Sequence, residues 1–106
     1  MITVRDNPAE HRYEIHDGDQ LAGFSTYKLT TDTIAFTHTE TLPAFSGRGL
    51  ARQLVVGALD DARRRGLAVR PYCPYVREII LRLADTYLDL VREDEREQFG
   101  LVPDVV

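Results

Sequence analysis

The sequence lacks the features that hold secreted and membrane-embedded chains together. Its 106 residues include one cysteine, so neither an internal disulfide nor a cysteine-based zinc site can form. No apolar run approaches the roughly 18 residues of a membrane span, and the first residues do not resemble a signal peptide. These absences exclude a disulfide scaffold, a zinc finger and a membrane protein, and we expect a cytoplasmic location with no membrane partner.

What is present fits one globular domain. The chain is 43% hydrophobic and 28% charged, and a domain of this length buries roughly two thirds of its unfolded surface. We therefore predict a single domain over residues 1–106. Residues 1–10 are expected to be a flexible arm, which could close with a short first strand, and residues 92–106 an exposed polar or helical tail. The net charge of −4 argues against a nucleic-acid partner.

The basic residues are concentrated in the middle of the chain. Eight arginines and three acids lie between Arg48 and Arg82, whereas seven acids and two arginines follow from Leu83 to Val106. This distribution indicates one discrete anionic ligand rather than a long polyanion. The simpler alternative is that these arginines are exposed to solvent on helix faces and bind no ligand.

The first third of the chain predicts an antiparallel meander. Residues 12–16 alternate polar and apolar side chains, and Asp17-Gly18-Asp19 signals a tight turn. Residues 20–29, with Leu21, Phe24 and Tyr27 among their apolar members, predict a second strand, and residues 33–39, rich in β-branched and aromatic residues, predict a third. Gly23 inside the second strand indicates a bulge or a close approach of two backbones.

The pattern then changes to a helical period. Apolar residues recur at helical spacing over residues 50–62, and Gly66 is placed to cap that helix. Residues 67–72 predict another strand, Cys73-Pro74 the start of a second helix, and residues 86–91 a last short strand. The predicted fold class is α+β, an antiparallel meander followed by helix–strand–helix, with the helices packed on a mostly antiparallel sheet.

The loop before the first helix carries the clearest chemical signal. Small residues at Gly47, Gly49 and Ala51 let a ligand approach exposed amides at the positive end of a helix dipole. Arg48 and Arg52 occupy the first turn, where acids are normally favoured, and a bound phosphate would remove that conflict. The loop lacks the Gly-Lys-Ser/Thr of a P-loop and does not follow the first strand of a Rossmann unit. We predict an anion site, against the alternative of an ordinary glycine-containing loop.

The same loop resembles the GNAT superfamily of acetyl-CoA-dependent N-acetyltransferases. Residues 46–51 match that family's Gln/Arg-x-x-Gly-x-Gly/Ala signature at both small-residue positions and depart from it at Ser46. Together with residues 36–40 and 71–76, they resemble a small GNAT subgroup of about this length, over roughly residues 12–90.

The resemblance implies acetyl-CoA as the cofactor. Backbone groups of Thr41 and Leu42 would bind pantetheine, and the glycine loop with its two arginines would hold the pyrophosphate. The implied cofactor-binding residues are Thr41, Leu42, Ser46, Gly47, Arg48, Gly49, Leu50, Ala51 and Arg52.

Four residues are candidates for catalysis. Cys73 at a helix N-terminus could accept an acetyl group as a thiolate, or it could be a small buried side chain. His38 and Glu40 could remove a proton from the attacking amine, although His38 could equally lie in the core beside Phe36 and Glu40 in solvent. Tyr75 could protonate the departing CoA thiolate, a role that the resemblance implies, or pack over the cofactor. No residue spacing indicates a metal.

These observations predict an N-acetyltransferase that moves acetyl from acetyl-CoA to a primary amine, directly or through Cys73. Asp17-Gly18-Asp19 joins two strands where larger GNAT enzymes insert helices, so we expect an open acceptor side. Such a side would suit a macromolecular amine, a site completed by a second subunit in a homodimer, or an unspecific site. The alternative function is a CoA-binding or protein-interaction module with little catalysis.

Overall fold

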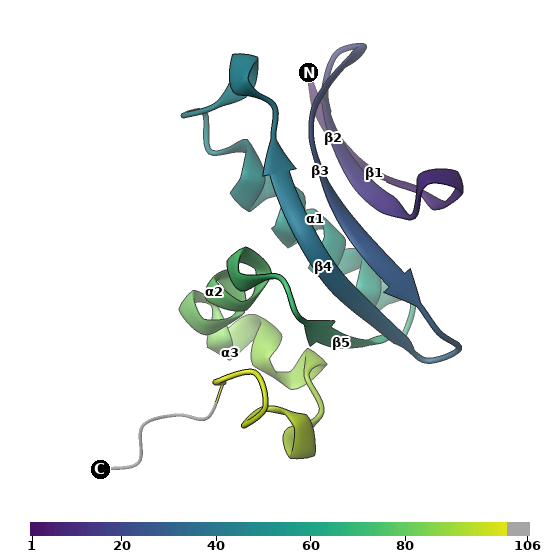
Figure 1. The fold of residues 1–106 in the computed structure, drawn as a ribbon, viewed down its shortest axis with the longest axis vertical. Helices are drawn as coiled ribbons and strands as arrows, with labels where there is room; N and C mark the ends of the chain where they lie inside the picture. The colour runs from purple at the N-terminus through teal and green to yellow at the C-terminus, as the bar shows by residue number, and fades with distance from the viewer. Residues whose placement is uncertain (102–106) are drawn as a thin grey trace.

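A computed structural model describes residues 1–101, in which five strands form one sheet in the order β1-β2-β3-β4-β5 (Figure 1). Strands β1 to β4 pair antiparallel as a meander, and β5 joins β4 in parallel. The predicted α+β class is confirmed. The elements are β1 (Ile2–Asn7), η1 (Pro8–Glu10), β2 (Arg12–Asp17), β3 (Gln20–Leu29), β4 (Thr33–Thr41), η2 (Pro43–Phe45), α1 (Leu50–Arg64), β5 (Ala68–Pro71), α2 (Pro74–Arg82), α3 (Ala84–Tyr87), η3 (Leu88–Leu90) and η4 (Glu93–Glu95).

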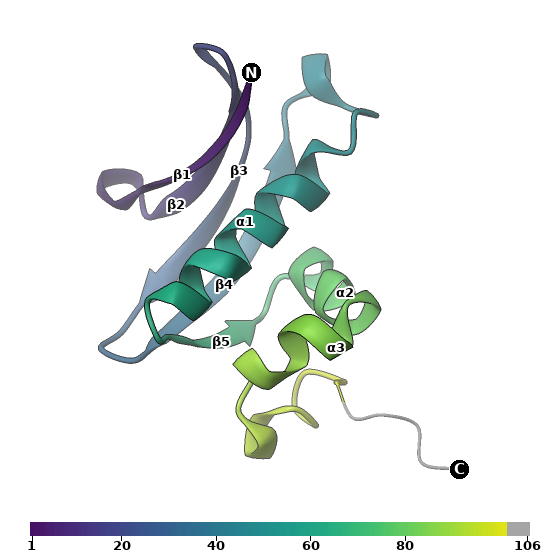
Figure 2. The same ribbon diagram turned by 180° about the vertical axis from the view of Figure 1, so that it is seen from behind.

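Helix α1 crosses one face of the sheet and supplies much of the core (Figure 2). Its side chains Leu54, Val55 and Leu59, which recur every few residues, are fully buried because they form the stripe that faces the strands. The helix ends at Arg64, and Gly66 caps it as predicted, with a φ of +70°. The left-handed conformation favours glycine and allows the chain to turn back into β5.

Strands β4 and β5 are paired at one end only. Their register runs from Thr33 opposite Ala68 to Phe36 opposite Pro71. Beyond that point β4 continues, whereas the segment after β5 leaves the sheet. The Cys73 N–H in this segment donates to the Phe36 carbonyl at 2.9 Å. The two segments therefore diverge (Figure 1), and we call the opening between them the fork.

A β-bulge in β4 reverses which side chains face the helices. Thr26 of β3 lies opposite His38 and Tyr27 lies opposite Phe36, so Thr37 is the extra residue. Phe36, before the bulge, is buried on the side of α1. His38, after the bulge, is exposed on the opposite side, which we call the open face.

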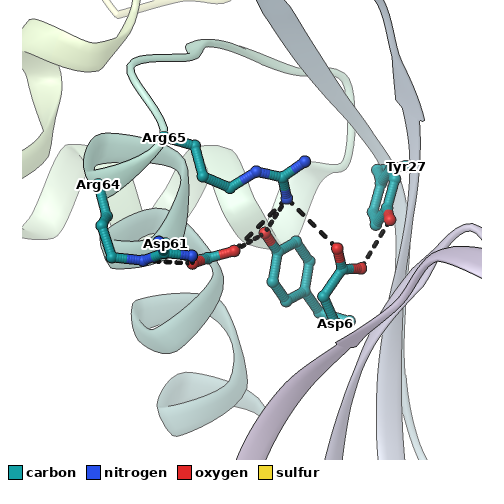
Figure 3. A network of polar contacts seen from close by, with 6 residues as sticks. Asp6, Tyr27, Asp61, Arg64 and Arg65 are labelled. Atoms are coloured by element: carbon teal, nitrogen blue, oxygen red, sulfur yellow. Dashed lines mark hydrogen bonds and ion pairs between the residues drawn. The ribbon is translucent and has the colours of Figure 1, made fainter.

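The prediction of a flexible arm over residues 1–10 is wrong, because this segment contains β1, an edge strand paired with β2 along its whole length. Figure 3 shows how its Asp6 is fixed: the carboxylate accepts a hydrogen bond from the Tyr27 hydroxyl at 2.6 Å and pairs with Arg65 at 3.3 Å. Burial, followed by the hydrogen bond to Asp6, raises the pKa of Tyr27. The network ties β1 to β3 and to the segment that follows α1.

The predicted last strand over residues 86–91 is also wrong. This segment forms the end of α3 and the turn η3, because its buried side chains Tyr87 and Leu90 are spaced for a helical turn rather than for alternation.

The predicted polar tail over residues 92–106 packs against the domain as far as residue 101. Phe99 and Leu101 are buried, and Glu95 forms a bidentate ion pair with an arginine of β5 at 2.9 and 3.0 Å. The remainder of the predicted tail, 102–106, lies outside the described residues.

Candidate functional site

The loop between β4 and α1 presents the N-terminus of α1 without a side-chain cap. Gly47 and Gly49 have φ values of +79° and +71°, a region that favours glycine. Gly49 is the N-cap residue and has no side chain, and the first helical bond runs from the Gln53 N–H to the Gly49 carbonyl. The amides of residues 50–52 are therefore left for a ligand. With the helix dipole they give this helix end the geometry that an anion site requires, at the position where the sequence predicts one.

Two arginines flank this N-terminus, and the first turn of α1 contains no acid. Arg48 donates to Asp17 in the β2–β3 hairpin at 3.0 Å, and its guanidinium lies 5.6 Å from the centre of the Phe45 ring. The bond from Arg48 lowers the pKa of Asp17. Arg52, the third residue of α1, is exposed to solvent. Arg48 thus has one internal partner that an incoming anion must replace.

The backbone groups of Thr41 and Leu42, both predicted to contact the cofactor, point to opposite sides of β4. The Leu42 N–H donates to the Ala22 carbonyl at 2.8 Å, so it is not free to bind pantetheine as predicted. In an antiparallel pair this bond turns the backbone N–H and C=O of Thr41 and Thr39 away from β3. On that side β5 has already left the sheet, so these groups line the fork.

The side chains of two further predicted cofactor residues make contacts within the protein. The Ser46 N–H and hydroxyl both donate to the Pro43 carbonyl, at 3.3 and 3.1 Å, so they stabilise the loop itself. The Leu50 side chain is buried in the core, which leaves only its amide for the anion site.

Cys73 lies at the base of the fork, at the predicted N-cap of α2. It is 3% exposed, and its thiol donates to the Thr39 hydroxyl at 3.4 Å. The same hydroxyl shares a hydrogen bond with the buried Ser25 at 2.9 Å. The thiol therefore joins the two sides of the fork and faces its interior.

His38 and Glu40 are together on the open face. Their side chains are 60% and 49% exposed and lie 3.3 Å apart, from the imidazole Nε2 to the carboxylate Oε1. The alternative that His38 lies in the core beside Phe36 is wrong, because the bulge at Thr37 shifts the alternation by one residue. The pair is accessible to an amine that approaches from this side.

Tyr75 lies in the first turn of α2 and is half-buried. Burial, and then the charge of Glu78, raises its pKa, while nearby Arg52 acts in the opposite direction. The hydroxyl therefore keeps its proton at neutral pH, as a proton donor must.

Sequence reasoning did not identify three contributors to this site. Thr39 links the thiol to β4, Thr37 is the bulged residue, and Asp17 holds Arg48. The run of alternating threonines before the glycine loop is a visible signal for the first two. No local pattern marks Asp17, whose partner lies 31 residues away.

These features define an α+β protein with an uncapped helix N-terminus beside a forked pair of strands. Residues 12–91 match the profile of the family described as GCN5-related N-acetyl-transferase (Acetyltransf_CG), and the chain belongs to this family. The fold is similar to the NMR solution structure of a GCN5-like protein from Staphylococcus aureus, with a TM-score of 0.61, 21% identity, and coverage of 85% of this chain and 87% of that one. A search of curated proteins gave no significant match.

Within residues 1–101, none of the helices has the length and apolar character needed to cross a bilayer.

The Arg48–Asp17 pair leads to a prediction about affinity. Asp17→Asn removes the carboxylate that competes with a diphosphate for Arg48, so we expect acetyl-CoA to bind about two- to fivefold more tightly, in line with the weak exposed ion pair that is lost. Isothermal titration at low salt measures this change. Asp19→Asn, on the other side of Gly18, is the matched control and should bind as the parent protein does. Weaker binding by Asp17→Asn would mean that the aspartate orients Arg48 rather than competes for it.

Proposed function

We propose that the protein binds acetyl-CoA and transfers its acetyl group to a primary amine. The observation that carries this proposal is the uncapped N-terminus of α1, flanked by Arg48 and Arg52, beside the fork. A diphosphate suits that N-terminus because it accepts hydrogen bonds from several amides and two guanidinium groups. Pantetheine, which carries two amide groups, suits the backbone of Thr39 and Thr41 as an added strand would.

The side chains around the fork supply proton transfer. Acetyl-CoA brings an acetyl group activated as a thioester. In the transfer the amine nitrogen bonds to the acetyl carbon and the carbon–sulfur bond breaks, while the amine loses a proton and the thiolate gains one. His38 with Glu40 receives the proton on the open face, and Tyr75 donates one to the thiolate.

Direct transfer is favoured over an acetyl-Cys73 intermediate. The thiol is almost fully buried and donates to Thr39, whereas the His38–Glu40 pair is open to solvent. After incubation with acetyl-CoA and no acceptor, intact-mass spectrometry should show an unmodified protein. An adduct of one acetyl group that is absent from Cys73→Ala would establish the route through the thiol.

Binding and turnover test the proposed function separately. Isothermal titration should show that acetyl-CoA binds at least about a hundredfold more tightly than acetyl-pantetheine, which lacks the diphosphate and its charged hydrogen bonds. A thiol-release assay with a panel of small amines should then show turnover. Equal binding of the two thioesters would contradict the assigned anion site.

One observation favours a second candidate, a CoA-binding module with little catalysis. The β2–β3 turn at Gly18-Asp19 inserts no helices, and His38 and Glu40 remain uncovered. Tight acetyl-CoA binding without turnover of any amine would support that module and contradict the acetyltransferase proposal.

A further inference from the structure

A hollow of about 440 Å³ lies on the open face of the sheet, away from α1. Its residues alternate along three strands with the buried core residues Tyr27, Phe36 and Val69. The hollow is lined by Lys28 from β3, by Thr33, Ala35 and Thr37 from β4, and by Arg70 and Tyr72 from β5 and the residue after it. Ala35 forms the floor because its small side chain stands between two long ones, Lys28 and Arg70, in register across the sheet.

The hollow reaches the base of the fork. Phe36 and Pro71 form the last pair of β4 and β5, and Thr37 and Tyr72 are the residues that follow on each side. His38, the next residue of β4, lies on the same face. An amine held in this hollow therefore meets the fork from the side opposite α1, next to the groups that would take its proton.

The charge of the hollow is positive, and one residue is responsible. Arg70 is neutralised by Glu95 through a bidentate pair at 2.9 and 3.0 Å, and Asp32 nearby by Arg92 at 3.2 Å. Lys28 is the only lysine in the chain, is exposed, and has no ion-pair partner among residues 1–101. No acid is among the lining residues.

A larger hollow of about 500 Å³, beside β1 and the end of α1, has no net charge, because three arginines and three aspartates line it. Asp6, Asp61, Arg64 and Arg65 form ion pairs there, as Figure 3 shows.

We propose that the hollow over Ala35 is the acceptor site and that it selects amines that also carry an anionic group, a carboxylate or a phosphate. This proposal rests on the proposed acetyl transfer. Lys28 binds the anion, and the amine points along β4 past Thr37 toward the fork. From Ala35 to Thr37, two residues along the strand, the distance is about 7 Å. This distance matches the separation between the amine and the anionic group in a short ω-amino acid or an aminoalkyl phosphate. A polyamine would place a second cation against Lys28.

Matched acceptors test this selection in the thiol-release assay. γ-Aminobutyrate is compared with butylamine, and aminoethyl phosphate with ethanolamine. We expect the anionic member of at least one pair to have a KM about tenfold lower, the size expected for a hydrogen bond to a charged group. The pair that shows the difference identifies carboxylate or phosphate as the preferred anion.

Substitution of Lys28 assigns the preference to this hollow. Lys28→Gln should reduce the kcat/KM ratio within the preferred pair to near one, and Lys28→Arg should retain most of it. Arg5→Gln, an exposed cation of β1 remote from the hollow, is the matched control and should leave the ratio unchanged. Without acetyl-CoA, the preferred acceptor should shift the amide NMR signals of Lys28, Ala35 and Arg70.

The outcomes separate this proposal from the proposed function. Absence of acetyl-CoA binding would overturn both. Turnover with equal KM for each pair, or a preference for polyamines, would overturn the acceptor site alone. Acetylation of Lys28 itself, found by peptide mass spectrometry, would also overturn it, because the residue would then be the acceptor rather than the anion-binding group.

Discussion

Replacing Arg52 with glutamate is expected to weaken acetyl-CoA binding at least about tenfold, a loss of about 1.4 kcal/mol, and to make the protein slightly more stable. The new carboxylate lies in the first turn of α1, where it repels a diphosphate. The same carboxylate interacts favourably with the helix dipole, by about 0.3–1 kcal/mol. Isothermal titration and urea unfolding measure the two effects.

The opposite signs make this variant informative. A protein that binds weakly because it is misfolded would lose stability, whereas Arg52→Glu should gain it. Arg64→Glu, in the last turn of α1, is the matched control: it loses the ion pair with Asp61 and opposes the dipole, so it should be less stable and bind acetyl-CoA normally. An Arg52→Glu protein with unchanged affinity would contradict the assigned anion site.

Gly23→Ala is expected to destabilise the fold by about 2–3 kcal/mol, a typical cost of overpacking. A Cβ at Gly23 would lie 2.6 Å from the carbonyl oxygen of Glu40, closer than real contacts allow. Because that oxygen belongs to the backbone, β4 itself must move, and with it Thr41 at the fork. We expect the melting temperature to fall by roughly 10 °C or more and acetyl-CoA to bind more weakly.

Gly57→Ala in α1 is the control for adding a methyl group. Its Cβ would lie 2.9 to 3.2 Å from the side-chain carbons of Val4, so the edge strand β1 must move, whereas β4 and the fork are untouched. Alanine is the better helix former by about 1 kcal/mol, which offsets part of that cost. We therefore expect a smaller fall in melting temperature than for Gly23→Ala, and unchanged acetyl-CoA binding. If Gly23→Ala were as stable as Gly57→Ala, the close approach of β3 and β4 would not constrain the fork.

Residues whose role is set by local geometry were predictable from the sequence. The glycine loop before α1, Gly66 after it and Cys73 before α2 depend on backbone conformations and dipoles within a few residues of each position. The close approach at Gly23 was predictable because glycine weakens the interior of a strand and is typical of positions where another backbone comes near.

Residues whose role depends on distant partners were not predictable. Residues 1–10, predicted as an arm, contain β1, whose Asp6 contacts Tyr27 and Arg65 far along the chain. The exposed position of His38 depends on one extra residue at Thr37, and alternation read from sequence assumes a regular strand. Leu42 was assigned to the cofactor because its bond to the Ala22 carbonyl leaves no trace in the local pattern.

The bulge at Thr37 decides which side chains of β4 face which side of the sheet. If Thr37 were paired as in a regular strand, the alternation would carry His38 and Glu40 inward, and Thr39 would turn to solvent and lose contact with Cys73. Deleting Thr37 would instead leave both faces as they are, because His38 would then follow Phe36 directly. A single unpaired residue thus sets the orientation of the last third of the strand.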